Sequence, residues 1–200
     1  MDKNSRIIIT GASGLLGQNT ILLLREKGYN NLLAIDMHKK NIEILRELNP
    51  GLEIIEADLA MPGDWQDAFK GADVLIQSHA KITSLTLEEF KRDNETATVN
   101  VLEAAKKHNI PYIVHISSSV VIAVSDDFYT QTKKAQDKLV IESGIKHCAL
   151  RPPLMFGWFD KKHLGYKRRP AYPPALCLSI RSHQRTYHRN HDQSKSLQIH

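Results

Sequence analysis

The sequence predicts an α/β fold built on a doubly wound parallel sheet. Three observations support this fold class. Strand-like and helix-like segments alternate along residues 6–153, a glycine-rich turn joins the first strand to the first helix, and 42% of the 200 residues are hydrophobic. Such alternation implies βαβ units and a parallel sheet covered on both faces. Right-handed crossovers then wind the sheet outward in two directions.

The first half of the alternating region predicts three strands and two helices. Residues 6–10, RIIIT, are a short β-branched run before glycines. Residues 15–28 have apolar side chains at helical spacing and end at a glycine. Residues 32–36 are a second apolar strand, and residues 39–49 form a helical pattern that stops before a proline. Residues 52–58 complete this half as a third strand.

The second half continues the alternation and closes with two prolines. The helical segments show apolar positions three or four residues apart, and the strands are short apolar runs. The predicted elements, in order, are helix 62–72, strand 73–78, helix 85–108, strand 112–117, helix 127–143 and strand 147–153. In a doubly wound sheet, ligands bind outside the carboxyl ends of the strands, at the point where the strand order reverses.

Charge divides the chain into two parts. Residues 158–200 hold nine Lys and Arg against two Asp and Glu, whereas residues 1–157 hold 18 against 20. We expect a first domain over residues 1–165 and an atypical basic tail over residues 166–200, either disordered or aberrant in sequence. The alternative is a tail that binds nucleic acid or an anionic membrane. Neither a helical pattern nor an array of aromatic residues supports that alternative.

Composition narrows the class of protein further. The N-terminus lacks the apolar core of a signal peptide, and no segment approaches the roughly 18 apolar residues of a membrane span. Cys148 and Cys177 are too few for a disulfide framework or a metal site. We therefore expect a cytoplasmic protein that uses no metal, nucleic acid or membrane partner.

The glycine-rich turn predicts a dinucleotide site. In TGASGLLG the glycines are Gly11, Gly14 and Gly17. One allows a tight turn, one lets the backbone approach a pyrophosphate, and one lets the helix pack closely. The helix N-terminus supplies amides for the phosphates, and we expect Ser13 and Leu15 of the same turn to contact the cofactor. The alternative is a plain strand-to-helix turn, but the position between the first strand and first helix favours the cofactor.

Two acidic residues follow the next two strands. Asp36 ends the second strand, where a carboxylate can accept hydrogen bonds from an adenosine ribose and repel a 2′-phosphate. This position favours NAD, with NADP the less favoured cofactor, over the alternative of a turn or cap residue. Asp58 and Leu59 follow the third strand. The Asp58 carboxylate can meet the adenine amino group or cap a helix, and the two readings stay open.

The segment YTQTK places Tyr129 four residues before Lys133. On a helix this spacing puts both side chains on one face, about one turn apart. An ammonium group beside a phenol favours the phenolate, so the pair suits a catalytic acid/base. The same spacing also occurs in ordinary helices, so the pair alone does not decide the matter.

Seven features occur along the chain in a fixed order: TGASGLLG, Asp36, Asp58-Leu59, NETATVNVLEAA, ISSS, YTQTK and LRPP. This order resembles that of the extended short-chain dehydrogenase/reductase family, in its NAD-dependent epimerase/dehydratase branch. The resemblance covers residues 5–160 and implies a Rossmann fold. It also implies that the chain is C-terminally truncated, since the family continues into a small substrate-binding subdomain.

The resemblance assigns roles to single residues. Tyr129 is the expected acid/base, Lys133 its partner and a contact of the nicotinamide ribose, and Asn94 an organiser of the active site. Ser119 is the expected serine that holds the substrate oxygen, with Ser118 the second choice and a merely structural serine cluster the alternative.

Two further residues complete the cofactor set implied by the resemblance. Ala80 is expected to line the cofactor and Pro152 to lie along the nicotinamide. His79 departs from the family pattern and is expected to make local hydrogen bonds rather than catalyse.

Two functions remain in view. The first is an NAD-dependent oxidoreductase, epimerase or dehydratase that acts on a hydroxyl- or carbonyl-bearing substrate, with a nucleotide sugar ahead of a sterol-like or small carbonyl compound. The second is a non-catalytic NAD(P)-binding protein or an inactive truncated relic. By analogy with the family, a homodimer through helices 90–108 and 127–143 is expected.

Overall fold

The computed structural model describes residues 1–153 and residue 155. Its centre is one six-stranded sheet, in which every neighbouring pair of strands is parallel and the order is β3-β2-β1-β4-β5-β6. The strands are β1 (Ile7–Thr10), β2 (Leu32–Asp36), β3 (Glu53–Glu56), β4 (Val74–Gln77), β5 (Ile113–Ile116) and β6 (His147–Leu150). The predicted doubly wound α/β fold is confirmed.

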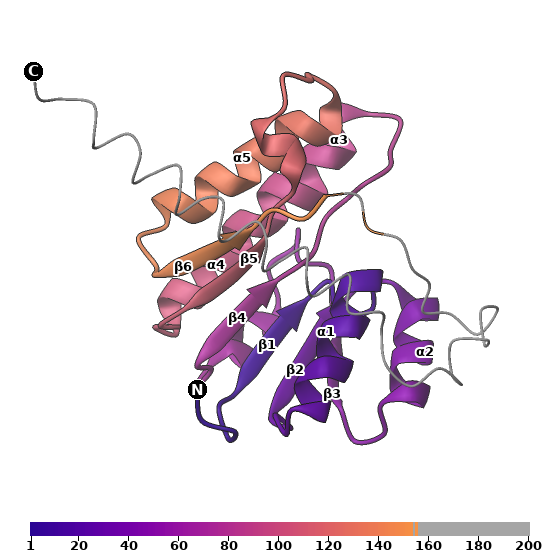
Figure 1. Ribbon diagram of the computed structural model, residues 1–200, viewed down its shortest axis with the longest axis vertical. Helices are drawn as coiled ribbons and strands as arrows, with labels where there is room; N and C mark the ends of the chain where they lie inside the picture. The colour runs from indigo at the N-terminus through magenta and orange to yellow at the C-terminus, as the bar shows by residue number, and fades with distance from the viewer. Residues whose placement is uncertain (154, 156–200) are drawn as a thin grey trace, which may run out of the picture. The chain divides into compact units, whose positions relative to one another are not determined.

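The connections between the strands are mostly helical (Figure 1). The α-helices are α1 (Leu15–Glu26), α2 (Lys39–Leu48), α3 (Leu87–Phe90), α4 (Ala97–Lys107) and α5 (Phe128–Glu142). Shorter turns of other geometry are the 3₁₀ segments Asp64–Phe69 and Ser119–Ile122 and the π-helical segment Lys91–Thr96. Each predicted strand and helix therefore has a counterpart, with bounds that differ by a few residues.

Alternate side chains along the strands pack into two separate hydrophobic cores, one on each face of the sheet. On one face, Ile7 and Ile9 of β1 pack with Ile21 of α1 and Leu45 of α2. On the other face, Ile8 of β1 packs in a larger core with side chains from β2, β4 and β5 and from α4 and α5. Burial on both faces explains why the strands read as continuous apolar runs rather than as alternating ones.

Two predicted helices differ from regular α-helix. The expected helix at 62–72 is a 3₁₀ segment, because Gly63 and Gly71 bracket a stretch of only a few residues. The expected helix at 85–108 is continuous from α3 to α4 but contains the π-helical segment Lys91–Thr96. π-helical turns are rare and are frequent at functional sites. The predicted tail over residues 166–200 lies outside the described residues.

The sheet reverses its order between β1 and β4. Thr10 at the end of β1 is in register with Gln77 at the end of β4, and the chain leaves these strands in opposite directions. Parallel strands bring their carboxyl ends to one edge. The glycine turn, Asp36, Asp58, Ala80 and Ser119 all follow strand ends and therefore lie along this edge.

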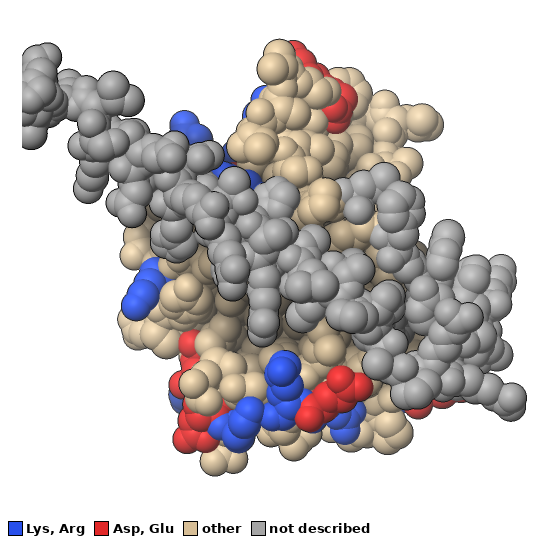
Figure 2. Space-filling model, viewed as in Figure 1, with Lys and Arg blue, Asp and Glu red and all other residues tan. Residues whose placement is uncertain are grey.

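Charged side chains on the described surface are mixed in sign. In Figure 2, basic and acidic groups are interspersed on the part of the viewed face that the structure describes. Several form exposed pairs, such as Arg6 with Glu53 and Lys107 with Asp67. Such pairs contribute little to stability, about 0–1 kcal/mol each. Within residues 1–153 and 155, no helix is long and apolar enough to cross a membrane.

Candidate active site

Three glycines shape the turn after β1, each in a different way. Gly11 has φ of +65°, and a Cβ there would lie 2.6 Å from the backbone of His79. A Cβ at Gly17 would lie 2.4 Å from the Gly11 carbonyl oxygen and 2.5 Å from Ala12 Cα. A Cβ at Gly14 would meet only the Gly11 oxygen, at 3.3 Å. Gly11 and Gly17 are therefore required by the fold, whereas the space beside Gly14 is largely open.

Asp36 holds the glycine turn against the end of β2. One of its carboxylate oxygens accepts a hydrogen bond from the Ser13 amide at 2.9 Å. The other accepts from the amides of Met37 and His38, at 2.8 and 3.1 Å. A carboxylate has about four acceptor positions, so these three bonds fix its orientation and leave acceptor capacity.

Asp58 is engaged on both of its oxygens. One accepts from the Ala60 amide at 3.0 Å and so closes the turn after β3, and the other pairs with the guanidinium of Arg92. The hydrogen bond that Arg92 donates to Asp58 raises the pKa of Arg92 above its ordinary value. Leu59 is buried, and its carbonyl accepts from Asn100 of α4 at 2.9 Å. Asp58 closes a turn rather than capping the following helical segment, whose N-cap residue is Gly63, and its adenine contact stays a prediction.

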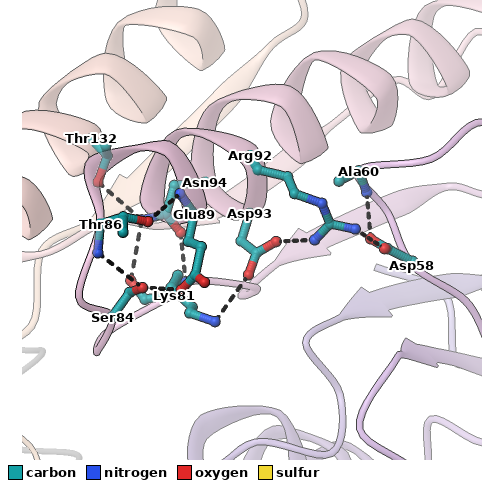
Figure 3. Close-up of polar contacts among 10 residues, drawn as sticks. All are labelled: Asp58, Ala60, Lys81, Ser84, Thr86, Glu89, Arg92, Asp93, Asn94 and Thr132. Atoms are coloured by element: carbon teal, nitrogen blue, oxygen red, sulfur yellow. Dashed lines mark hydrogen bonds and ion pairs between the residues drawn. The ribbon is translucent and has the colours of Figure 1, made fainter.

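The π-helical segment sends three consecutive side chains in three directions (Figure 3). Arg92 reaches Asp58 and also pairs with Asp93. Asp93 pairs in turn with Lys81 across 3.4 Å. Asn94 points instead to the backbone of Lys81 and to Thr132. The segment therefore links the turn after β3, the loop after β4 and the helix α5.

Asn94 is a buried clamp between two elements of the site. Its Oδ1 accepts from the Lys81 amide at 2.6 Å, and its Nδ2 donates to the Lys81 carbonyl at 3.1 Å. The same Nδ2 donates to the Thr132 hydroxyl at 3.0 Å. That hydroxyl donates to the carbonyl of Phe128, 2.8 Å away on α5. The predicted organising role of Asn94 agrees with these contacts.

Helix α5 begins with a strong cap next to Tyr129. Asp127 accepts hydrogen bonds from the Thr130 amide at 2.9 Å and from the Ser125 hydroxyl at 2.6 Å. The Ser125 and Thr130 bonds lower the pKa of Asp127 to about 2. Tyr129 is partly buried, and its hydroxyl makes no hydrogen bond to any described residue.

Lys133 lies one turn further along α5 and is 1% exposed. Its Nζ donates to the Ile116 carbonyl at 3.1 Å, at the end of β5, and to Oε1 of Gln136. Burial lowers the pKa of Lys133 to about 8, against an opposing effect of Asp137. Lys134, at the wrong spacing for the pair, turns away and donates to the Ala123 carbonyl at 3.0 Å.

The three serines after β5 have different surroundings. Ser117 is buried. The Ser118 hydroxyl accepts from the Val120 amide at 3.4 Å and so caps the 3₁₀ turn. Ser119 is partly buried, and its hydroxyl makes no hydrogen bond to a described residue. Ser119 thus keeps its hydroxyl available among the described residues, and the choice of Ser119 over Ser118 as the substrate-binding serine stays a prediction.

Ala80 and Pro152 flank these groups. Ala80 is exposed and directly precedes Lys81, whose backbone Asn94 holds. The Pro152 carbonyl accepts from the Ser119 amide at 3.0 Å and so ties the end of β6 to the serine turn. Contact of either residue with a cofactor stays a prediction.

His79 makes the local hydrogen bonds expected of it. Its Nδ1 lies 2.9 Å from the Thr10 hydroxyl and its Nε2 lies 3.3 Å from the Thr98 hydroxyl. Burial, followed by the nearby charge of Lys133, lowers the pKa of His79 to about 3. The ring is therefore neutral at physiological pH and acts as a spacer between β1 and α4.

Sequence reasoning missed three polar residues of the site: Arg92, Gln136 and Asp137. Asp137 binds Arg151 at 2.6 Å and contacts His115 across 3.3 Å. Gln136 and Asp137 stand three and four residues after Lys133, so helical spacing could have marked both as neighbours of the lysine. Arg92 had no such signal, because its partner Asp58 is 34 positions away. No group of metal-binding side chains occurs among the described residues.

Two curated enzymes are similar to this chain in sequence. The chain is 28% identical over 175 residues to a ceramide reductase of Caulobacter vibrioides, which covers 88% of this chain and 54% of that enzyme. It is 25% identical over 184 residues to a 3-beta-hydroxysteroid dehydrogenase of Mycolicibacterium neoaurum, covering 78% and 49% of the two chains. The chain thus spans about half the length of the curated relatives that it matches.

A solved structure shares the fold. The UDP-glucuronic acid 4-epimerase from Bacillus cereus, in complex with NAD, superposes with a TM-score of 0.65 at 22% identity, over 74% of this chain and 56% of that one. The sequence model of the NAD dependent epimerase/dehydratase family matches residues 7–169. Because this match spans most of the chain, the protein belongs to the NAD dependent epimerase/dehydratase family.

Proposed function

We propose that this protein is an NAD-dependent oxidoreductase or epimerase that acts on a hydroxyl- or carbonyl-bearing small molecule. The observation that carries the proposal is the arrangement on and beside α5. Among the described residues the Tyr129 hydroxyl has no hydrogen-bond partner, Lys133 is buried one helical turn away, and Asn94 binds the same helix. Ser119, after the neighbouring strand end, likewise has a hydroxyl without a partner in the described part of the chain.

The residues after β1 and β2 fit a dinucleotide. Open space beside Gly14 would let a pyrophosphate approach the backbone, and the first amides of α1 have no acceptor within the helix. The oriented carboxylate of Asp36 suits a ribose diol and repels a 2′-phosphate, which favours NAD over NADP. Bound NAD would supply the hydride acceptor and donor for the reaction.

Each catalytic side chain has a defined task in this proposal. Tyr129 exchanges a proton with the substrate oxygen, and Ser119 donates a hydrogen bond to the same oxygen. Lys133 places a buried positive charge one helical turn from Tyr129 and would bind the nicotinamide ribose hydroxyls. Oxidation of an alcohol then removes its hydroxyl proton to Tyr129 while hydride leaves the carbon, and reduction reverses both transfers.

The substrate class is a nucleotide sugar in our first proposal. The fold shared with a UDP-glucuronic acid 4-epimerase is compatible with it. An apolar carbonyl compound is the second candidate, for a specific reason. Between Ser119 and Tyr129 the loop exposes Ile122 and Val124, with Ile122 76% accessible, and curated relatives include a ceramide reductase and a steroid dehydrogenase.

Two further expectations stay proposals. A homodimer through the helices at 90–108 and 127–143 can be tested by sedimentation of the purified chain. A cytoplasmic location rests on the low cysteine content, and Cys148 is the free cysteine among the described residues.

The proposed function is tested in two steps. The first compares the unfolding midpoint of the chain with and without NAD or NADP, where NAD should raise it more. The second follows NADH formation with nucleotide sugars and with hydroxylated lipids, for the parent and for Tyr129→Phe. Loss of turnover with an intact NAD-induced shift is expected for Tyr129→Phe. A parent chain that binds NAD but turns over neither class would favour binding without catalysis, and no NAD shift would contradict the proposal.

A further inference from the structure

The buried ammonium of Lys133 is held by a neutral side chain. An acidic residue, Asp137, stands four residues after Lys133, a spacing at which side chains on a helix can meet. Its carboxylate instead binds Arg151, the residue after β6, at 2.6 Å. Lys133 donates to Oε1 of Gln136 and to the Ile116 carbonyl. Its direct hydrogen-bond partners are therefore uncharged.

Gln136 is itself held in one orientation. It is fully buried, and its Nε2 donates to the Thr98 hydroxyl at 2.9 Å and toward the His79 carbonyl at 3.3 Å. An ammonium group has donors only, so the amide oxygen must face Lys133 and the amide nitrogen must face Thr98. A flipped amide would set donor against donor at Lys133. The orientation of Gln136 is thus determined from both ends.

Beyond Gln136 the hydrogen bonds form a chain in which each donor points away from Lys133. The Thr98 hydroxyl accepts from Gln136 and from Gln77 Nε2, which lies 3.0 Å away. With both acceptor positions used, its own hydrogen points to Nε2 of His79. His79 then donates through Nδ1 to Thr10, directly before the glycine turn. The chain of donors runs from Lys133 to the end of β1, and it requires a neutral His79.

We propose that Gln136 is a positioning residue for Lys133: its amide oxygen holds the buried ammonium one turn below Tyr129 without neutralising it. A carboxylate at this position would pair with the ammonium and neutralise its charge. An apolar side chain would leave the Ile116 carbonyl as the partner of the ammonium among the described residues. The inference rests on the proposed role of Lys133 beside Tyr129 and extends it to the residue that holds the lysine in place.

The test is a direct titration of the Lys133 side chain in the full chain labelled with ¹³C-lysine. The Lys133 resonance is identified by its absence from Lys133→Met. The titratable groups that interact electrostatically with Lys133 are Asp137 on α5, His115 on β5 and His79 after β4, and all are retained in each variant. Burial already lowers the pKa of Lys133 to about 8, which separates it from exposed lysines.

Three variants give different expectations. Gln136→Met keeps the volume and removes the acceptor, so the pKa of Lys133 should fall further, by about one pH unit. Gln136→Glu should raise it by roughly one to three pH units. Thr98→Val removes the group that holds the amide nitrogen and should lower the pKa in the same direction as Gln136→Met. Gln131→Glu is the matched control, since Gln131 lies on the same helix with its side chain at the surface.

The outcomes distinguish a positioning role of Gln136 from a general effect of charge on the helix. A folded Gln136→Met or Thr98→Val chain in which Lys133 titrates as in the parent would overturn the proposal. If Gln131→Glu raises the pKa as much as Gln136→Glu, the effect is one of charge on the helix and the proposal also fails. The titration needs neither NAD nor substrate. A chain that shows the expected shifts but no NAD binding would therefore contradict the proposed function while leaving the positioning role intact.

Discussion

Substituting alanine at Gly17 should destabilise the fold, whereas alanine at Gly14 of the same turn should leave stability nearly unchanged and block NAD. At Gly17, a Cβ would lie 2.4, 2.5 and 2.6 Å from the Gly11 oxygen, Ala12 Cα and Ala12 oxygen. All three are backbone atoms and cannot rotate away. Since carbon contacts are optimal at about 3.5–4.0 Å, α1 would have to move by about 1 Å from the turn. Overpacking of this kind costs about 3 kcal/mol, the upper part of its usual range.

Gly14 presents the opposite case. Its added Cβ would meet one atom, the Gly11 oxygen, at 3.3 Å, and its φ of −74° is accessible to alanine. Alanine is a poorer helix cap than glycine but reduces the entropy of the unfolded chain, so the net change should be below about 1 kcal/mol. If a pyrophosphate approaches the backbone here, the same methyl group would block it.

Urea unfolding with and without NAD measures both effects. NAD at a hundredfold its dissociation constant should stabilise the parent by about 2.7 kcal/mol. Gly17→Ala should lower the free energy of unfolding without ligand, whereas Gly14→Ala should leave it nearly unchanged and lose the NAD-dependent increment. The reasoning would be refuted by a Gly14→Ala chain that keeps the full increment, or by a Gly17→Ala chain as stable as the parent.

Three further predictions follow from single side chains. Asp36→Asn keeps one of the two acceptor oxygens and removes the charge. Relative to the unliganded variant, the NAD-induced rise in unfolding midpoint should shrink and the NADP-induced rise should grow; unchanged cofactor preference would contradict the role of Asp36. Asp127→Ala should cost about 1 kcal/mol at neutral pH by removing the cap of α5. Because the folded-state pKa of Asp127 is depressed to about 2, this difference should be lost as pH falls from about 4 toward 2, and a constant difference in acid would argue against it. The folded-state pKa of His79 is about 3, below its ordinary 6.5, so its contribution to the free energy of unfolding should be complete above pH 6.5. Between pH 6.5 and 3 that free energy should fall by about 1.4 kcal/mol per pH unit. In His79→Gln this dependence on pH should be lost, and unfolding curves measured across the pH range test it.

The sequence by itself determined the architecture and the order of its motifs. Apolar runs of four or five residues alternate with helical spacing, and these local periodicities predict a parallel sheet with two covered faces. The need for glycine at Gly11 and Gly17 was also readable, because a turn between a strand and a tightly packed helix admits little else. Helical spacing likewise placed Tyr129 and Lys133 on one face of α5.

Only the tertiary structure decided which partner each polar group takes. Asp58 pairs with Arg92 from 34 positions away, and Asn94 and Gln136 reach Thr132 and Thr98 across 38 positions each. The tertiary structure also distinguishes the three serines after β5, because their hydroxyls differ in burial and in local partners, which spacing does not reveal. Local pattern specifies an element and its buried face. The partner of a buried polar atom is set by the requirement that it form a hydrogen bond with whatever the folded chain brings beside it.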